Sequence, residues 1–361
     1  MALAIRHDYL PAQPIHIRRG PRYEVKFRAP YSMTHALIAI PTLNEAGTIA
    51  HVLADLLADD HRFPIVVFDG GSTDCTCDIV NDFARQHPQV RLLHNLERTQ
   101  ARAINAAARI AQQQGAQVLV RVDAHARYPK GFVSALVRTI QERGADSIVT
   151  PLIAIDHSEP WPHAAAVLQR SWLGNGGAVH RRTTSPGWVD HGHHAAFRLS
   201  AFLALGGYNT DFCANEDAEY DHRLTQAGGR IYLDTNLPVL YLPRASPAAL
   251  FAQMRRNGFW RMHMLRHHNL RPALRQLLPL FATALCPFSA IAGIVWAPFA
   301  IPVMIYLIVV AVTAATVARK TPALVPRVML LAIFMHLGFG LGGLAAMRVE
   351  RRPYQSRQLI A

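Results

Sequence analysis

The sequence predicts an α/β fold with a doubly wound, mostly parallel sheet, followed by C-terminal transmembrane helices. Short apolar runs alternate with amphipathic helical patterns between residues 36 and 250, which is typical of such sheets. No charged residue occurs from 277 to 318, a length that can hold two membrane crossings. The composition, 51% hydrophobic and 17% charged, excludes a disordered, collagenous or coiled-coil chain.

The predicted strands and helices alternate through the first part of the chain. The run ALIAIP at 36–41 is a buried strand, and Ile49, Val52 and Leu56 then recur on one helix face. Ligands of a doubly wound sheet bind beyond the carboxyl ends of its strands, so the residues where strands stop are the candidate site. The same pattern predicts strands at 63–68, 90–93 and 117–122, and helices through Ile79 and Phe83, from Thr99 to Gly115, and opening at Pro129.

Acidic and glycine residues stand where three of these strands end. Asp69 and Asp123 each follow a Val-rich run, where an unpaired carboxylate is costly. Asn44 and residues 72–74 have a plainer interpretation as helix caps, which does not account for the two aspartates. Acids at one sheet edge, beside a Gly-Gly turn, favour the ribose and metal-bound diphosphate of a nucleotide. A dinucleotide fold is excluded, because no G-x-G-x-x-G motif opens the first helix.

The net charge of +13 lies on the flanks of the chain and does not indicate nucleic-acid binding. Residues 31–250 are slightly acidic, whereas residues 251–276 carry six basic residues and no acidic one. Anionic lipid headgroups fit this distribution better. The four cysteines form no C-x-x-C pair, which argues against structural zinc and a disulfide scaffold.

The C-terminal region contains two long uncharged segments. The first, 277–318, has prolines that predict a turn near 297–302. The second, 328–347, carries Gly338, Gly340, Gly342 and Gly343, a composition typical of close helix packing in membranes.

The orientation of these segments conflicts with the distribution of positive charge. Arg319, Lys320 and Arg327 favour a cytosolic loop, yet three crossings would place Arg348 and the basic residues after it outside. One basic segment therefore breaks the positive-inside tendency, unless part of the first uncharged segment only dips into the bilayer.

Four motifs in a fixed order resemble the inverting family 2 glycosyltransferases, which have the GT-A fold. They are P-T-L-N-E at 41–45, D-G-G-S-T-D at 69–74, D-A-H at 123–125 and N-E-D at 215–217. The resemblance covers roughly residues 36–260. The H-G-H-H-A-A-F-R stretch and the C-terminal helices resemble members that build exopolysaccharide.

The resemblance implies roles for particular residues. Asp217 would be the catalytic base, with Glu216 beside it, because direct displacement at the anomeric carbon needs one base. Asp123 and His125 would occupy the positions that hold a divalent metal on the diphosphate. The implied nucleotide-sugar-binding residues are Pro41, Thr42, Glu45, Asp69, Arg98, Asp123 and Arg256.

His125 departs from the second aspartate that the family usually has. Carboxylate suits Mg²⁺ or Mn²⁺, and an imidazole at this position leans toward Mn²⁺. Whether His125 binds metal or only hydrogen-bonds Asp123 stays open at this stage.

Two further clusters have weaker signals. His191, His193 and His194 lack a Cys or Glu partner at zinc spacing and are assigned to an acceptor loop. The run starting at Gln253 matches the beginning of the Q-x-x-R-W motif of processive synthases, but Asn257 stands where Trp belongs. Either Arg256 or Arg261 is a candidate for reaching the donor diphosphate; alternatively, both belong to a basic amphipathic segment at the bilayer surface.

We therefore predict four regions: a basic arm at 1–32, a GT-A domain at 33–250, a basic interfacial segment at 251–276, and a membrane region at 277–361 with two to three transmembrane helices. The predicted enzyme is a multi-pass protein of the inner membrane whose catalytic domain faces the cytosol. It transfers one sugar, glucose being favoured, from UDP to a lipid-linked acceptor, with a β linkage by inversion. The alternatives are a processive polysaccharide synthase and a polyprenyl-phosphate sugar transferase.

Overall fold

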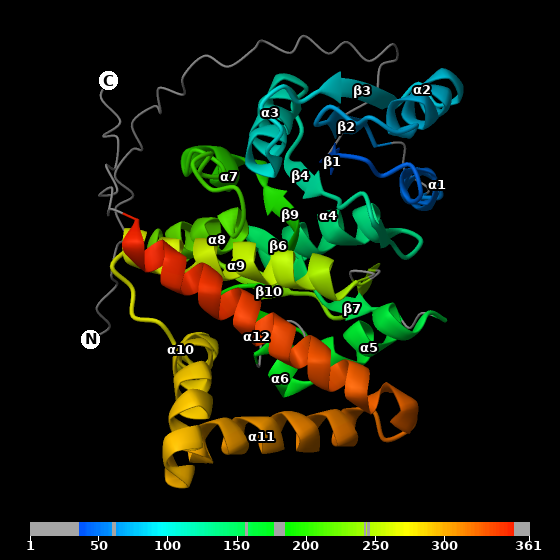
Figure 1. Cartoon of the computed structure of the whole chain (residues 1–361). Helices are drawn as coiled ribbons and strands as arrows, with labels where there is room; N and C mark the ends of the chain where they lie inside the picture. Colours follow the sequence, from blue (N-terminus) through cyan, green and yellow to red (C-terminus); the bar gives the residue numbers. More distant parts are fainter. Residues whose placement is uncertain are drawn as a thin grey trace, which may run out of the picture.

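The computed structural model describes residues 36–59, 63–155, 158–176, 185–241, 243 and 246–349. The predicted basic arm at 1–32 and the chain after 349 lie outside these residues. Figure 1 shows a sheet domain on one side of the molecule and long C-terminal helices on the other.

The larger sheet of the described chain has the strand order β3-β2-β1-β4-β9-β6-β10-β8. Its first four strands are parallel, whereas β9 and β8 run antiparallel to their neighbours. The strands are β1 (Ala36–Thr42), β2 (Ile65–Asp69), β3 (Val90–His94), β4 (Val118–Arg121), β6 (Ser147–Thr150), β8 (Gly187–Val189), β9 (His193–Arg198) and β10 (Ile231–Leu233). A smaller sheet joins β5 (Ala126–Arg127), β11 (Val239–Tyr241) and β7 (Leu152–Ala154).

Helices cover both faces of the larger sheet, because alternate residues of each buried strand face opposite sides. Ile38 packs in one core cluster and Leu37 in the other. The Ile38 side is covered by α1 (Ile49–Leu57), α2 (Thr76–Gln86) and α4 (Phe132–Arg143). The Leu37 side is covered by α3 (Gln100–Gln113), α7 (Leu199–Ala204) and α8 (Glu216–Gln226).

This arrangement confirms the predicted doubly wound α/β sheet, with two differences in detail. The helix expected to open at Pro129 begins instead at Phe132, after Gly131 in a left-handed conformation (φ 73°). The strands β6, β8, β9 and β10 and the smaller sheet were not predicted, because their runs are short and lack strong alternation.

The remaining helices follow the sheet or intervene before its last strands. They are α5 (Pro160–Gln169), α6 (Trp172–Asn175), α9 (Pro247–His267), α10 (Leu274–Val295), the 3₁₀ turn η2 (Ala297–Ala300), α11 (Ile301–Val317), the 3₁₀ turn η3 (Pro322–Leu324) and α12 (Val325–Arg348). The turn predicted near 297–302 corresponds to η2 and the start of α11. The boundaries predicted at 250/251 and 276/277 fall inside α9 and α10, and the domain division stays a prediction.

Within the part of the chain that the structure describes, three segments are long and apolar enough to cross a membrane: Leu274–Val295, Ala297–Val317 and Pro322–Arg348. The three differ in how far they are buried within the protein. Only 11% of the apolar stretch of each of the first two is buried, against 44% for the third. The third segment therefore belongs more closely to the body of the protein than its composition suggests.

A glycine at the start of the loop before α8 fixes one contact between sheet layers. Gly207 has φ of 72°, and a Cβ there would lie 3.0 Å from Cγ of Asn105. The Asn105 amide accepts from the backbone N–H of Tyr208 at 2.8 Å and donates to the Tyr208 carbonyl at 2.8 Å. Gly207 is thus needed for Asn105 on α3 to hold Tyr208.

We expect Gly207→Ala to lower the free energy of unfolding by about 1–3 kcal/mol, because it combines left-handed backbone strain with a clash. Gly115→Ala is the matched control. Gly115 has the same φ of 72°, but nothing lies within 4 Å of its Cβ position. Thermal unfolding of both variants in detergent checks this expectation; equal losses would show that the Asn105 contact contributes nothing.

Candidate functional site

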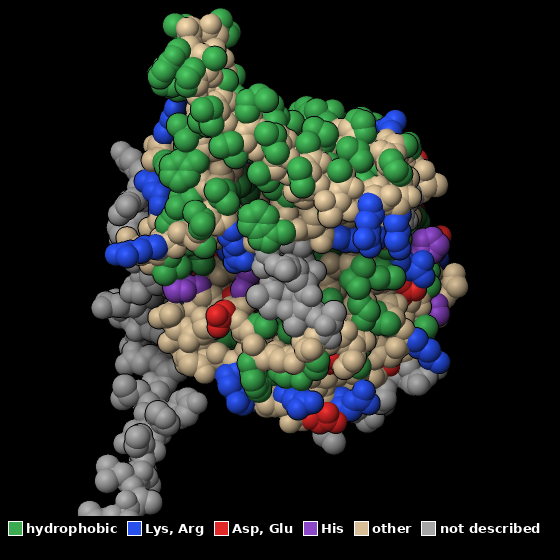
Figure 2. Space-filling model, turned by 90° about the horizontal axis from the view of Figure 1, so that it is seen from below, with side chains coloured by type: hydrophobic (Ala, Val, Ile, Leu, Met, Phe, Trp, Pro, Cys, Tyr) green, Lys and Arg blue, Asp and Glu red, His purple; other side chains and the backbone are tan. Residues whose placement is uncertain are grey.

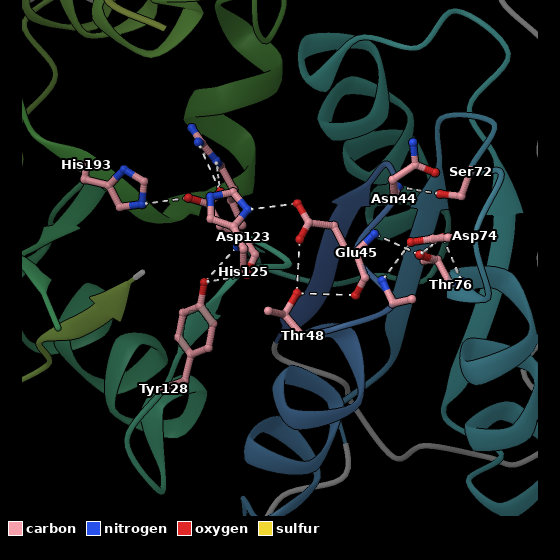
Figure 3. Close-up of polar contacts among 12 residues, drawn as sticks. Asn44, Glu45, Thr48, Ser72, Asp74, Thr76, Asp123, His125, Tyr128 and His193 are labelled. Carbon is pink, nitrogen blue, oxygen red and sulfur yellow. Dashed lines mark hydrogen bonds and ion pairs between the residues drawn. The ribbon is translucent and has the colours of Figure 1, made fainter. Parts of the chain in front are cut away.

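Four side chains form a row across the carboxyl ends of β1 and β4 (Figure 3). Nδ1 of His125 lies 3.1 Å from Oε1 of Glu45, which follows β1. Oδ2 of Asp123, just after β4, lies 3.1 Å from Nε2 of His193 at the start of β9. Tyr128 supports the loop between them: its hydroxyl accepts from the Asp123 backbone N–H at 2.7 Å and donates to the Asp123 carbonyl at 3.2 Å.

The loops after β1 and β2 are joined by side-chain hydrogen bonds, also drawn in Figure 3. Oδ1 of Asn44 accepts from the Thr73 backbone N–H at 2.8 Å, and Ser72 Oγ accepts from the Asn44 N–H at 2.8 Å. Asp74 Oδ2 accepts from the Ala46 N–H at 3.1 Å. The plainer interpretation, in which Asn44 caps α1, is therefore wrong. Asn44 joins the loop after β1 to the loop after β2.

Asp69 holds the Gly-Gly turn after β2. Its carboxylate accepts from the backbone N–H groups of Gly71 at 2.9 Å and Ser72 at 3.1 Å. Although burial opposes ionisation, the hydrogen bonds from Ser72 and Gly71 lower the pKa of Asp69. The cost of a carboxylate at the end of a buried strand is therefore offset by backbone donors, and the predicted contact of Asp69 with a nucleotide stays a prediction.

Asp123 is balanced by a buried arginine. Nη2 of Arg121 lies 3.2 Å from Oδ1 of Asp123, and Nη1 donates to the Tyr208 hydroxyl at 3.3 Å. Burial would raise the pKa of Asp123, but the Arg121 guanidinium, helped by His193 and His125, holds that pKa well below its usual range. Asp123 thus stays ionised at the open end of β4, with 16% of its side chain exposed.

The structure gives His125 a partner that neither alternative named, and metal binding by His125 stays a prediction. Its imidazole contacts Glu45, whereas His193 contacts Asp123. Among the described residues, no three His, Cys, Asp or Glu side chains are grouped so as to hold a metal ion. An ionised carboxylate beside imidazole nitrogens still fits a divalent cation whose remaining ligands are diphosphate oxygens.

The predicted catalytic acids stand at the start of α8. Asn215, with a left-handed φ of 57°, precedes the buried Glu216 and the half-buried Asp217. Burial, together with the adjacent Asp217 carboxylate, raises the pKa of Glu216 to about 7, against the lowering effect of Arg121. Both acids act electrostatically on Arg121, so the start of α8 and the end of β4 belong to one site.

The other acids of α8 are used in packing. Asp221 Oδ2 lies 2.6 Å from Nδ1 of His191, which explains the first histidine of the H-G-H-H stretch. Glu219 accepts from Arg223 at 2.7 Å and lies 3.1 Å from Nε2 of His268, the residue that directly follows α9. Although burial opposes it, the hydrogen bonds from His268 and Arg223 lower the pKa of Glu219.

The remaining predicted binding residues are distributed unevenly. Pro41 and Thr42 end β1, and Thr42 Oγ1 donates to the Phe68 carbonyl at 3.4 Å. The guanidinium of Arg98 lies over Gly71, where a Cβ would meet its Nη2 at 3.2 Å. Arg256, in contrast, lies exposed on α9, and no contact places it with these strand ends.

Of the two candidate arginines of α9, Arg261 is the one on which the predicted catalytic acid Asp217 acts electrostatically. Burial lowers the pKa of Arg261, opposed by the negative charges of Asp217 and Asp221. Of the two arginines that the sequence left open, the structure therefore favours Arg261. The side-chain amide of Asn215 donates to the Asn257 carbonyl at 3.4 Å, a second contact between α9 and the start of α8.

Sequence reasoning gave Arg121, Tyr208 and His193 too little weight. Arg121 was detectable, since a lone arginine in the apolar run QVLVRV requires a buried partner. Tyr208 follows a Gly-Gly pair, which marked a special backbone. The sequence could not show that His193, and not His191, contacts Asp123, because this depends on the register of β9 against β4 and β6.

Comparison with known proteins agrees with this geometry. The model of glycosyl transferase family 2 matches residues 37–206. Succinoglycan biosynthesis protein ExoA of Rhizobium meliloti (strain 1021) is 40% identical over 265 residues, covering 73% of this chain and 79% of that protein. A second relative, from Methanococcus voltae, is 24% identical over 229 residues, covering 59% of this chain and 68% of its own length. It is named dolichyl N-acetyl-alpha-D-glucosaminyl phosphate 3-beta-D-2,3-diacetamido-2,3-dideoxy-beta-D-glucuronosyltransferase.

A solved structure has the same fold. Mannosyltransferase PcManGT from Pyrobaculum calidifontis, determined in complex with GDP-Man and Mn²⁺, superposes with a TM-score of 0.54 at 20% identity, covering 91% of both chains. The sheet and its strand-end site thus define a glycosyltransferase of the GT-A fold. The chain belongs to glycosyltransferase family 2.

The raised pKa of Glu216 predicts a pH-dependent stability. The folded protein holds this proton up to about pH 7, whereas an ordinary glutamate, with a pKa of 4.5, loses it at lower pH. The folded state therefore binds the extra proton between these values, and its stability should fall as pH rises through that window and level off above it.

Glu216→Gln, which imitates the protonated side chain, should flatten this decline. Melting temperatures measured from pH 4.5 to 8 check the slope. Glu142→Gln, at an exposed position on α4, is the matched control and should keep the wild-type slope. An unchanged slope in Glu216→Gln would show that another group causes any pH dependence.

Proposed function

We propose that this glycosyltransferase transfers a single sugar from a UDP-sugar to a lipid-linked acceptor at the inner membrane, with inversion at the anomeric carbon. The 40% identity to ExoA supports a role in the biosynthesis of a succinoglycan-like exopolysaccharide, with glucose as the favoured sugar. The catalytic domain would face the cytosol, where sugar nucleotides are made.

One observation carries the proposal for a lipid-linked acceptor. The start of α8, which bears Asp217, contacts α9 through Asn215 and Asn257, and the end of α9 contacts α8 through His268 and Glu219. α9 also packs against α12, which is the last of the three apolar C-terminal helices. An acceptor hydroxyl carried on a lipid would therefore meet Asp217 close to the membrane side of the domain.

The proposed reaction is a direct displacement. The Asp217 carboxylate takes the proton of the acceptor hydroxyl, and the oxygen attacks the anomeric carbon of the donor sugar. The bond from this carbon to the diphosphate oxygen breaks, and its electron pair leaves with UDP. Because attack and departure occur on opposite faces, an α-linked donor gives a β-linked product.

The diphosphate would be bound at the β4 edge. Asp123 would hold a divalent cation, with His125 or His193 as an imidazole ligand, and the bound cation would neutralise charge on the departing diphosphate. The Mn²⁺ of PcManGT supports a cation of this kind here. Arg121 keeps Asp123 ionised, and Arg261 would place positive charge near the leaving group.

The nucleoside would occupy the loops after β1 and β2. Pro41, Thr42, Glu45 and Asp69 stand there, and Arg98 covers the Gly-Gly turn. The hydrogen bonds that join these loops make the pocket floor rigid before the donor binds, which lowers the entropic cost of binding.

A polyprenyl-phosphate sugar transferase is the second candidate. The name of the Methanococcus relative supports the first function instead, because the dolichyl-linked acceptor in that name already carries a sugar. A processive synthase is less favoured. Asn257 occupies the position of the motif tryptophan, and its carbonyl accepts from Asn215. Polyprenyl phosphate alone and a polyprenyl-linked saccharide, offered separately as acceptors, distinguish the first two functions.

Washed membranes containing the full chain should release UDP from one member of a sugar-nucleotide panel when Mn²⁺ and lipid extract are present. Asp217→Asn should lower single-turnover transfer by roughly 10²–10⁴-fold, the usual contribution of a general base, and leave UDP affinity near normal. Asp211→Asn, an exposed acid on the loop before α8, is the matched control and should transfer normally.

Two results would contradict this assignment. If no donor releases UDP with any acceptor extract, the proposed transfer is wrong. If Asp217→Asn retains more than about a tenth of wild-type transfer, Asp217 is not the base, and Glu216 or Asp221 becomes the next candidate.

Asp123→Asn should weaken Mn²⁺-dependent UDP binding, because the charged ligand is lost while the size of the side chain is kept. Calorimetry of UDP binding with and without Mn²⁺ measures this effect. Asp78→Asn, at an exposed position on α2, is the control. Equal Mn²⁺ dependence in wild type and Asp123→Asn would remove Asp123 from the metal site.

A further inference from the structure

The third apolar helix, α12, lies along α9 in the same direction (Figure 1). Its glycines allow this close approach. A Cβ on Gly338 would lie 2.7 Å from the Phe251 carbonyl oxygen, and one on Gly343 would lie 3.1 Å from Cγ of Met262. Nearer the end of both helices, Arg266 donates a hydrogen bond to the Ala346 carbonyl. The two helices therefore share one orientation relative to the bilayer.

The composition of α9 keeps it out of the hydrocarbon core. An arginine at the centre of a bilayer is costly, because its charge leaves water for hydrocarbon. A helix with several of them lies at the membrane surface, with its charged groups among the headgroups. Those in α9 are Arg255, Arg256, Arg261 and Arg266.

The middle of α12 is bound to the catalytic domain. Nε2 of His336 donates to the Leu173 carbonyl at 3.3 Å, and Leu173 belongs to α6, within the segment that matches the family model. Nδ1 of His336 accepts from the Tyr306 hydroxyl at 3.1 Å. The first half of α12 also packs with Leu168 of α5. A crossing helix has its middle at the centre of the bilayer, which would carry α6 into hydrocarbon.

The other two apolar helices contact the middle of α12 but are far more exposed beyond that contact. Thr283 of α10 donates to the His336 carbonyl at 3.3 Å, and Tyr306 of α11 contacts the His336 ring. Their connection, η2, stands at the end of a hairpin whose side chains are widely exposed: Ile294 to 86% and Val295 to 88%. Trp296 and Phe299 at this connection are exposed as well. Figure 2 shows apolar side chains gathered over one half of the face seen from below, where α10, α11 and α12 lie in Figure 1, with Lys and Arg side chains at its edge.

We propose that α12 lies in the plane of the membrane surface and that only the α10–α11 hairpin enters the hydrocarbon core. One side of α12 packs on α9 and the catalytic domain, and its opposite side rests in the acyl boundary beneath anionic headgroups. The chain then returns to the side from which it entered, and the end of α12 lies on the same side as the catalytic domain.

This topology removes the charge conflict found in the sequence. With a hairpin that enters and returns, Arg319, Lys320, Arg327 and Arg348 all lie on the side of the arginines of α9. The basic residues then follow the positive-inside tendency without exception. They also ring the apolar face with positive charge, which suits anionic lipids.

Reporter fusions at residue 361 of the full chain test the position of the C-terminus. Green fluorescent protein folds to a fluorescent state in the cytosol, and alkaline phosphatase is active only after export. The in-plane arrangement predicts a fluorescent fusion and an inactive phosphatase fusion in bacterial cells. An active phosphatase with a dark fluorescent-protein fusion would show that α12 crosses, and would overturn the proposal.

A disulfide between the ends of α9 and α12 tests their packing in intact membranes. Met262→Cys with Gly343→Cys, in a chain whose native cysteines are replaced by serine, should cross-link on mild oxidation, since the built Cβ and the Met262 Cγ are 3.1 Å apart. Met262→Cys with Leu341→Cys, whose second position is exposed to 43%, is the control and should not. If α12 crossed the bilayer, Gly343 would lie near its far side and no selective cross-link would form, so absence of the selective cross-link overturns the proposal.

Discussion

The ion pair between Arg121 and Asp123 is the interaction on which the rest of the site depends. Arg121 ends β4 and is 7% exposed, so its charge must be met inside the protein. Asp123, Tyr208 and the two acids that open α8 surround it. One buried guanidinium thus joins the end of β4 to a segment some 90 residues later, which contains Tyr208 and the start of α8, and it keeps a carboxylate ionised where a cation would bind.

The same network gives the neighbouring acids different protonation. Asp123 has the guanidinium and His193 as partners, and its pKa is low. Glu216 is buried next to another carboxylate, and its pKa rises to about 7. In the proposed mechanism, the proton that Glu216 holds below about pH 7 reduces the repulsion between the two adjacent carboxyl groups at the start of α8.

Much of the fold could be predicted from the sequence because the buried parallel strands and their helices carry strong periodic patterns. The strands around Ile38 and Val66 lie where the apolar runs predicted them. The short strand β9 was missed, and with it the contact between His193 and Asp123. Such a contact depends on the register of an antiparallel strand that arrives some 70 residues later, and no local pattern encodes that register.

The prediction of the candidate site residues also succeeded only in part. Acids at strand ends were found because burial makes them costly, whereas Arg256 was preferred for its place in a motif and lies exposed on α9. Arg261 lies near Asp217 only because α9 packs beside α8. Helix orientation of this kind comes from tertiary packing, which the weak amphipathic pattern of α9 did not reveal.

The close packing of α9 between α8 and α12 has a consequence for substrate choice. Hydrogen bonds join α8 to both the middle and the end of α9, and glycines join α9 to α12 without intervening side chains. If α12 rests on the bilayer, the packing of α8, α9 and α12 holds Asp217 at a fixed distance from the headgroups. Acceptors would then be selected by length, because a saccharide whose terminal sugar stands too far from its lipid would extend past the base.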